Sequence, residues 1–167
     1  MYLIPEPKEK KEMEGGFALS FKTRIVLKDE TENGLLYAGM LKSCIEEWAG
    51  FSPDVVRGRE KEGDICLKLC EGLKAEEYHI EIRGEGILAE GGEEAGILYA
   101  VSTLCQLIEQ QGNCLPCMEI KDEPDMPVRG YYLDQTRGRV LKLEELKKTV
   151  DRLCRYKMNQ LQLYVEH

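Results

Sequence analysis

The chain has 167 residues, of which 43% are hydrophobic and 32% are charged, a composition that supports a packed core with a soluble surface. Its net charge is −8: residues 1–120 hold 23 acidic and 13 basic side chains, against 8 and 10 in residues 121–167. Nucleic acid is therefore not an expected partner, because its binding depends on basic contacts to phosphate, and no apolar run is long enough to cross a membrane.

The start of the chain is predicted to be a short edge strand over residues 2–5, which prolines end. It holds no apolar secretion signal, so we expect a cytoplasmic protein. Residues 6–14 are rich in lysine and glutamate without a core-forming period, which indicates a mobile loop. Gly15 and Gly16 then predict a turn that leads into a strand over residues 17–21.

A strand and a helix come next. Branched residues predict the strand over residues 24–27, and Asn33 is a suitable N-cap for a helix over residues 35–49 that Gly50 ends. The apolar face of this helix consists of Tyr37, Leu41, Cys44, Ile45 and Trp48. We expect Trp48 to lie in the core rather than to serve as a platform for a sugar ring.

Further strands are predicted from short apolar runs, over residues 64–69, 78–83 and 86–90. The turn from Gly84 to Gly86 joins the last two as a tight hairpin. Glycines at positions 72, 91 and 92 mark turns that flank these strands.

A second helix is predicted over residues 93–110, where Ile97, Val101 and Leu104 belong to a broad apolar face. Such a face needs a sheet to cover it, and residues 115–120 add a last extended piece to the strands available. The order of these elements predicts an α+β fold, with one mixed β-sheet and both helices on one face.

Cysteine usage gives a weaker signal. The chain has seven cysteines and no secretory context, so free thiols in a reducing compartment are expected. Cys114 and Cys117 have redox or zinc-ligand spacing, but the nearest other pair, Cys66 and Cys70, does not complete a zinc site. We therefore expect neither a metal nor any other cofactor, and a thiol-redox protein using Cys114 and Cys117 stays an alternative.

The last part of the chain predicts a βαβ unit, which implies a parallel sheet. Residues 122–128 are polar with two prolines and are expected to form a linker. Strands are predicted over residues 131–133 and 161–165, on either side of a helix whose face carries Leu143, Leu146, Val150, Leu153 and Cys154. Asp134 and Arg137 follow the point where the first of these strands ends.

These residues resemble family 20 glycoside hydrolases, the β-N-acetylhexosaminidases. The run R-G-Y-Y-L-D-Q-T-R at 129–137, followed by a helix and K-M-N, is similar to the opening of the catalytic barrel in that family. A weaker likeness lies earlier, in the opening L-I-P and in T-L-C-Q-L at 103–107, which stand in the order found in the small α/β domain before the barrel. The resemblance implies such a domain over residues 1–121, and then the first βαβ unit of a truncated (β/α)8 barrel over residues 129–167.

The resemblance also implies a substrate site. Arg137 would contact hydroxyls of a terminal amino sugar, and Asp134 would orient Arg137 or tie down the loop. Glu166 stands one residue away from the acid that usually ends the second barrel strand, so it either takes that role or marks a changed substrate, and His167 is the final residue. From spacing alone, an ion pair of Arg137 with Asp134 or with a carboxylate of a neighbouring strand would be favoured. Arg129, at the start of its strand, is expected to be structural.

The reaction implied is release of terminal N-acetylhexosamines from glycans with retention, in which the substrate's own acetamide oxygen is the nucleophile. The Asp-Glu pair that serves this mechanism in the family follows the fourth barrel strand, so none of the 167 residues is assigned a catalytic role. We expect the isolated chain to be inactive, and its two barrel strands to pair with another copy, pack on the first domain or be disordered. The alternative from another class is a non-catalytic carbohydrate-binding or protein-interaction module.

Overall fold

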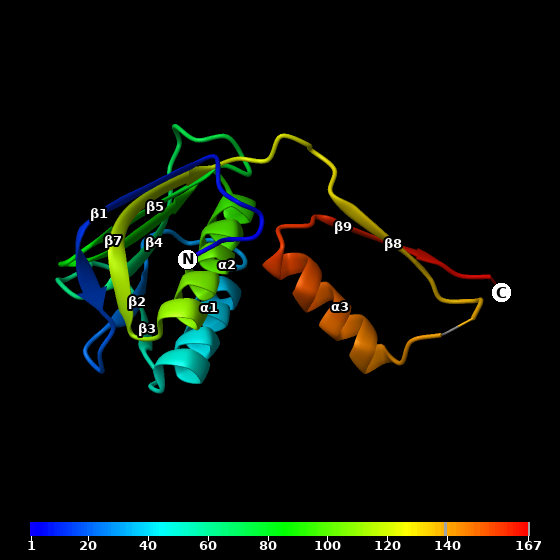
Figure 1. Ribbon diagram of the computed structural model, residues 1–167, viewed down its shortest axis with the longest axis horizontal. Coiled ribbons are helices and arrows are strands. Elements are labelled where there is room, and N and C mark those ends of the chain that lie inside the picture. Colours follow the sequence, from blue (N-terminus) through cyan, green and yellow to red (C-terminus); the bar gives the residue numbers. More distant parts are fainter. Residues whose placement is uncertain (139, 167) are drawn as a thin grey trace. The chain divides into compact units, whose positions relative to one another are not determined.

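The computed structural model describes residues 1–138 and 140–166 and divides the chain into two compact units, Met1–Pro124 and Asp125–His167 (Figure 1). The first unit contains helices α1 (Gly34–Ala49) and α2 (Glu94–Gln111) and strands β1 (Glu9–Ala18), β2 (Arg24–Leu27), β3 (Asp54–Arg57), β4 (Ile65–Leu69), β5 (Tyr78–Arg83), β6 (Gly86–Gly91) and β7 (Cys114–Asp122). The second contains β8 (Gly130–Asp134), α3 (Leu143–Arg155) and β9 (Gln160–Tyr164). Among the described residues, no helix is both long and apolar enough to span a membrane.

The first unit is built on a mixed sheet with the strand order β1-β7-β5-β6-β4-β2-β3. Strands β3, β2, β4 and β6 run parallel to one another, whereas β5 and β7 pair antiparallel with their neighbours. Both α1 and α2 cover the same face of this sheet (Figure 1). On β5, Tyr78, Ile80 and Ile82 face the helices and are buried, so the polar residues between them face outward. The predicted mixed sheet with two helices on one face is therefore confirmed.

The predicted strands at residues 24–27, 64–69, 78–83 and 86–90 and both predicted helices are also confirmed, within a residue or two at their ends. The predictions for the start of the chain were wrong. Residues 2–5 are not in a strand, and the expected loop at 6–14 is mostly part of β1, which pairs with β7 alone. A strand at the edge of a sheet can carry lysine and glutamate along its length because its side chains reach water. The expected turn at Gly15 and Gly16 is a bulge inside β1.

Trp48 was also wrongly predicted to lie in the core, since it is 45% exposed. The buried residues of α1 include Tyr37, Leu41 and Ile45, which recur in four-residue steps. The next residue in that row is Ala49, which packs against the core, so Trp48 falls at the margin of the buried face.

The second unit is the predicted strand, helix and strand, and β8 and β9 pair parallel with Leu133 opposite Leu163. Its strands are tied together at their amino ends by two residues of the R-G and K-M-N motifs. The Arg129 guanidinium donates to the carbonyl oxygen of Lys157 at 2.8 Å, and the Arg129 amide donates to the side-chain oxygen of Asn159 at 2.9 Å. Arg129 thus has the structural role expected of it.

The backbone of α2 is closely packed against neighbouring backbone at Gly96. A Cβ added at Gly96 would overlap the carbonyl oxygen of Glu77 and lie 3.0 Å from the Cα of Gly91, so Gly96→Ala should destabilise the fold by about 2–3 kcal/mol. Gly39 also lies inside a helix but has nothing within 4 Å of an added Cβ. Gly39→Ala is therefore the matched control and should stabilise by about 0.5–1 kcal/mol. Urea denaturation followed by circular dichroism measures both, and equal effects would contradict the close packing of α2.

Candidate functional site

The candidate site lies where β8 and β9 end. Because the two strands are parallel, their carboxyl ends share one edge, and the last residues, Asp134 and Tyr164, are directly opposite each other. The segments that follow are linked by the Gln135 amide, which donates to the carbonyl oxygen of Tyr164 at 2.9 Å. The Glu166 amide also donates to the Thr136 hydroxyl at 2.7 Å. These bonds hold the two strand ends together and so place Arg137 beside Glu166.

Arg137 is the centre of this arrangement. Its Nη2 donates to Oε1 of Glu166 at 2.6 Å and to the Tyr164 hydroxyl at 3.0 Å, and its Cζ lies 5.4 Å from the centre of the Tyr164 ring. The Tyr164 hydroxyl also donates to Glu166. The Arg137 side chain is nevertheless 67% exposed, so a guanidinium fixed on one side can donate to a ligand on the other.

Asp134 fixes the backbone rather than the guanidinium. Its Oδ1 accepts from the amides of Thr136 at 2.8 Å and Arg137 at 3.0 Å, which closes the loop in the manner of an Asx turn. Of the ion pairs that spacing alone would favour for Arg137, the structure has the one with a neighbouring strand's carboxylate, Glu166. Asp134 is thus placed to tie down the loop, one of the two roles expected of it.

The electrostatics of the site keep the carboxyls of Asp134 and Glu166 and the guanidinium of Arg137 ionised. Hydrogen bonds from Tyr164 and Arg137 lower the pKa of Glu166, and the Glu166 carboxylate raises the pKa of Arg137 in return. The amides of Thr136 and Arg137 lower the pKa of Asp134. A carboxyl whose pKa lies below its ordinary value is a poor proton donor near neutral pH. These carboxyls are therefore ionised near neutral pH and can accept hydrogen bonds from a polar ligand.

Sequence reasoning missed Tyr164. It was assigned to the second strand only, because its role depends on being opposite Asp134 in the parallel register. Strand alternation could have indicated it, since Tyr132 and Asp134 lie on one face of β8 and Tyr164 joins that face from β9. The Tyr132 and Tyr164 rings are 6.3 Å apart. His167 lies outside the described residues.

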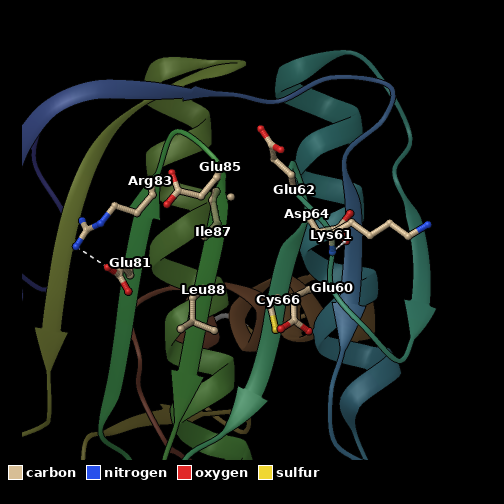
Figure 2. Close-up of a pocket in the computed structure, with 11 residues that line it drawn as sticks. Glu60, Lys61, Glu62, Asp64, Cys66, Glu81, Arg83, Glu85, Ile87 and Leu88 are labelled. Atoms are coloured by element: carbon tan, nitrogen blue, oxygen red, sulfur yellow. Dashed lines mark hydrogen bonds and ion pairs between the residues drawn. The ribbon is translucent and has the colours of Figure 1, made fainter.

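The first unit has a separate cavity of about 520 Å³ on the open face of its sheet (Figure 2). Charged side chains line it, but several of them are held in ion pairs: Arg83 with Glu81, and Asp64 with Arg24, whose Nε donates at 3.0 Å. Burial raises the pKa of the Cys66 thiol in its wall to about 11, so this thiol stays protonated near neutral pH. The ion pairs and the protonated thiol therefore have a structural explanation in this cavity.

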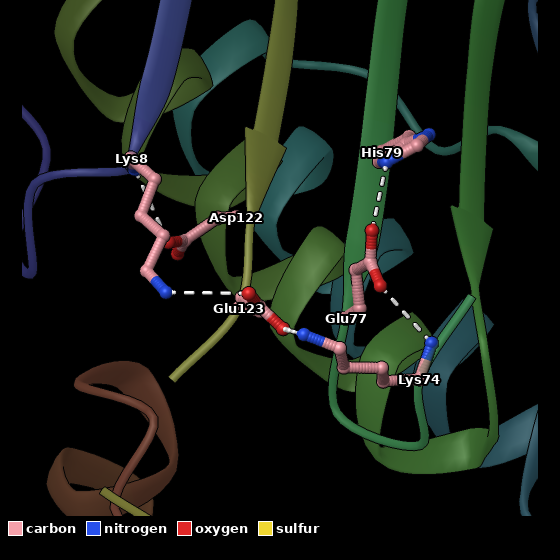
Figure 3. A network of polar contacts seen from close by, with 6 residues as sticks. All are labelled: Lys8, Lys74, Glu77, His79, Asp122 and Glu123. Atoms are coloured by element: carbon pink, nitrogen blue, oxygen red, sulfur yellow. Dashed lines mark hydrogen bonds and ion pairs between the residues drawn. The ribbon is translucent and has the colours of Figure 1, made fainter. Parts of the chain in front are cut away.

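A second polar cluster on the first unit is structural. Glu123, just after β7, accepts from Lys8 at 3.4 Å and from Lys74, and Glu77 contacts both Lys74 and His79 (Figure 3). The lysine partners, Lys74 above all, lower the pKa of Glu123. The cluster fixes the end of β7 against the start of β1 and the loop before β5. Exposed pairs of this kind add little stability but do define where the chain leaves the first unit.

The two cysteines with redox or zinc-ligand spacing lie on one strand. Cys114 is exposed and Cys117 is buried, and both are free thiols on β7. Among residues 1–138 and 140–166, no group of three or more histidine, cysteine or acidic side chains is placed to hold a metal ion.

Residues 1–123 match the family model described as glycosyl hydrolase family 20, domain 2. This chain belongs to glycosyl hydrolase family 20. A β-hexosaminidase of Porphyromonas gingivalis is 29% identical across 95% of the chain and 22% of that protein. The N,N'-diacetylchitobiase of Vibrio harveyi is 34% identical across 57% of the chain and 11% of that protein. The chain thus spans about a fifth or less of the length of these curated relatives.

Solved structures agree with this family assignment. The β-N-acetylhexosaminidase of Bacteroides fragilis matches with a TM-score of 0.79 and 27% identity, over 97% of this chain and 32% of that one. A β-hexosaminidase of Streptomyces plicatus matches in fold with a TM-score of 0.87 and 24% identity, over 98% of this chain and 34% of that one. The resemblance inferred from the two motif regions is confirmed.

The hydrogen bond from Tyr164 makes a prediction about Glu166. In the Tyr164→Phe variant the carboxylate loses that donor but keeps Arg137, so the pKa of Glu166 should rise toward its ordinary value without reaching it. Carbon-13 NMR titration of the glutamate carboxyls measures the change. Tyr131→Phe is the matched control. Tyr131 is on β8 and points to the other face of the two-stranded sheet, so this change should leave the pKa of Glu166 unchanged. An unaltered Glu166 pKa in Tyr164→Phe would show that the bond is absent in solution.

Proposed function

We propose that this chain is a part of a glycoside hydrolase that removes terminal N-acetylhexosamine residues from glycans. The single observation that carries the proposal is the Arg137 guanidinium, fixed by Glu166 and Tyr164 at the shared end of two parallel strands and two-thirds exposed. The relatives support it, because those from P. gingivalis and V. harveyi are named β-hexosaminidase and N,N'-diacetylchitobiase. The activity belongs to a longer protein, since the chain spans only part of their length.

The second unit has the properties expected of the first strand, helix and strand of a (β/α)8 barrel. Parallel sheets are normally covered on both faces, yet Tyr131, Tyr132 and Leu163 are each more than 40% exposed, and of the described residues of α3 none is buried. Further strands and helices of a (β/α)8 barrel would cover this apolar surface. In such barrels the active site lies at the carboxyl ends of the strands, which is the edge where Arg137 and Glu166 stand.

Each residue at the edge then has a distinct role. A planar guanidinium can donate to two neighbouring hydroxyls of a sugar ring at once, which is the role proposed for Arg137. The Glu166 carboxylate can accept from a sugar hydroxyl while it holds Arg137, and so fills the place of the usual acid. Asp134 serves the site through the loop, and Tyr164 keeps the guanidinium in position.

The proposed mechanism is hydrolysis with retention, assisted by the acetamide of the substrate. The groups at the edge bind and orient the sugar, because their lowered carboxyl pKa values do not suit an acid catalyst. The aspartate and glutamate that orient the acetamide and protonate the leaving group would come from a later strand end of the longer protein. We further propose a cytoplasmic location, and self-association of the isolated chain through the open edges of β8 and β9.

The isolated chain should not turn over an aryl N-acetylglucosaminide, because it lacks the acid that protonates the leaving group. A longer gene product that extends past residue 167 should hydrolyse the same compound. Release of the aryl group, measured spectroscopically on both proteins at equal concentration, tests this. Turnover by the 167-residue chain alone would contradict the proposed division of roles.

The role of Arg137 is tested in the longer protein. Arg137→Lys keeps the charge but loses the planar fork, and should lower kcat/KM by about 100-fold, or about 2.7 kcal/mol of transition-state stabilisation. Arg152→Lys makes the same change on the exposed surface of α3 and is the matched control, with an expected effect below about two-fold. Equal, small effects of both changes would remove Arg137 from the substrate site.

A further inference from the structure

The first residues of the chain lie along α2 rather than in the sheet, and two glutamines of that helix hold them. Gln106 is 5% exposed and stands one helical turn before Gln110. Between the two points of contact, Leu3 is 4% exposed and belongs to the hydrophobic core. This arrangement brings the L-I-P opening into contact with the glutamine of T-L-C-Q-L, the two motifs that carry the weaker family likeness.

Each glutamine pairs with the backbone of one residue through both a donor and an acceptor. The Ile4 amide donates to Oε1 of Gln106 at 2.9 Å, and Nε2 of Gln106 donates to the Ile4 carbonyl at 2.8 Å. The Tyr2 amide donates to Oε1 of Gln110 at 3.2 Å, and Nε2 of Gln110 donates to the Tyr2 carbonyl at 2.7 Å. Gln110 also donates to the carbonyl of Gln106 at 3.0 Å, which orients its amide.

The spacing explains why a helix can bind an extended backbone in this way. Residues four apart in an α-helix are separated by about 6 Å along its axis, and residues two apart in a strand by about 6.6 Å. In an extended segment, residues two apart also direct their amides and carbonyls to the same side. A carboxamide carries one donor group and one acceptor, as a peptide bond does, so the two glutamines act as a neighbouring strand would.

Selectivity in this arrangement comes from the side chain between the two anchored residues. Leu3 is buried, while Tyr2 is 75% exposed and Ile4 is 52% exposed. Main-chain bonds therefore supply affinity that does not depend on sequence, and the middle residue must be aliphatic and of similar size. This is the division found where a peptide adds to the edge of a sheet.

We propose that Gln106, Gln110 and the core position of Leu3 form a binding site for an extended peptide with an aliphatic middle residue. The chain's own residues 2–4 fill this site, and the same segment from a second copy binds it once the cis segment has been released. The site lies within the first unit and does not depend on the proposed hydrolase function.

The test uses protein that has folded intact. A protease recognition site is inserted after Glu6, the folded protein is cut, and a fluorescent peptide with the sequence of residues 1–6 is added in excess. Binding at one peptide per chain, seen by fluorescence anisotropy, is expected, with competition by the unlabelled peptide. If the cut protein loses its structure, the same peptide is expected to restore its circular dichroism spectrum.

Matched variants identify the groups responsible. A peptide with Ala in place of Leu3 should bind at least about 30-fold more weakly, while one with Ala in place of Ile4 should change by less than about three-fold. Gln106→Met should weaken binding by about ten-fold, and Gln110→Met by about three-fold because its bonds are exposed. A folded cut protein that binds no peptide, an unfolded one that the peptide does not restore, or equal binding by all variants would overturn the proposal.

Discussion

The parallel pairing of β8 with β9 is the interaction on which the candidate site depends. Antiparallel strands would put the residues after β8 and those after β9 at opposite edges, but the parallel register puts Asp134 opposite Tyr164 and brings Arg137 within 2.6 Å of Glu166. Parallel pairing also requires a crossover, which α3 provides. A two-stranded sheet with exposed apolar residues is seldom stable alone, which agrees with the proposal that further barrel strands cover it.

The ion pairs of the first unit and the ion pair at the candidate site differ in burial. On the first unit, ion pairs such as Arg24 with Asp64 hold neighbouring strands, and the Asp64 carboxylate is almost fully buried. At the ends of β8 and β9 the pair of Arg137 and Glu166 is exposed, so water or a ligand reaches both groups. Similar residue types therefore serve stability in one place and are available for recognition in the other, and burial makes the difference.

Most of the fold could be predicted from the sequence, because alternating and helical apolar periods mark the elements that bury a face. Strand β1 could not, since an edge strand pairs on one side only and tolerates the lysines and glutamates that suggested a loop. Strand β3 is also an edge strand, and its four residues are exposed or half-buried, so it lacks the buried branched run that marks β2. At the site, Asp134, Arg137 and Glu166 were found by motif, but Tyr164 was not, because its role depends on strand register. The link between residues 2–4 and α2 likewise needs the three-dimensional structure.

The central claim is that Arg137 stands at the rim of a barrel to bind a sugar. A crystal structure of the longer protein with N-acetylglucosamine bound tests it most directly. The account predicts β8 and β9 as the first two strands of a closed barrel, with the Arg137 guanidinium within hydrogen-bonding distance of the sugar hydroxyls and still paired with Glu166. A structure in which β8 and β9 have no further strand neighbours, or in which the sugar binds away from Arg137, would contradict it.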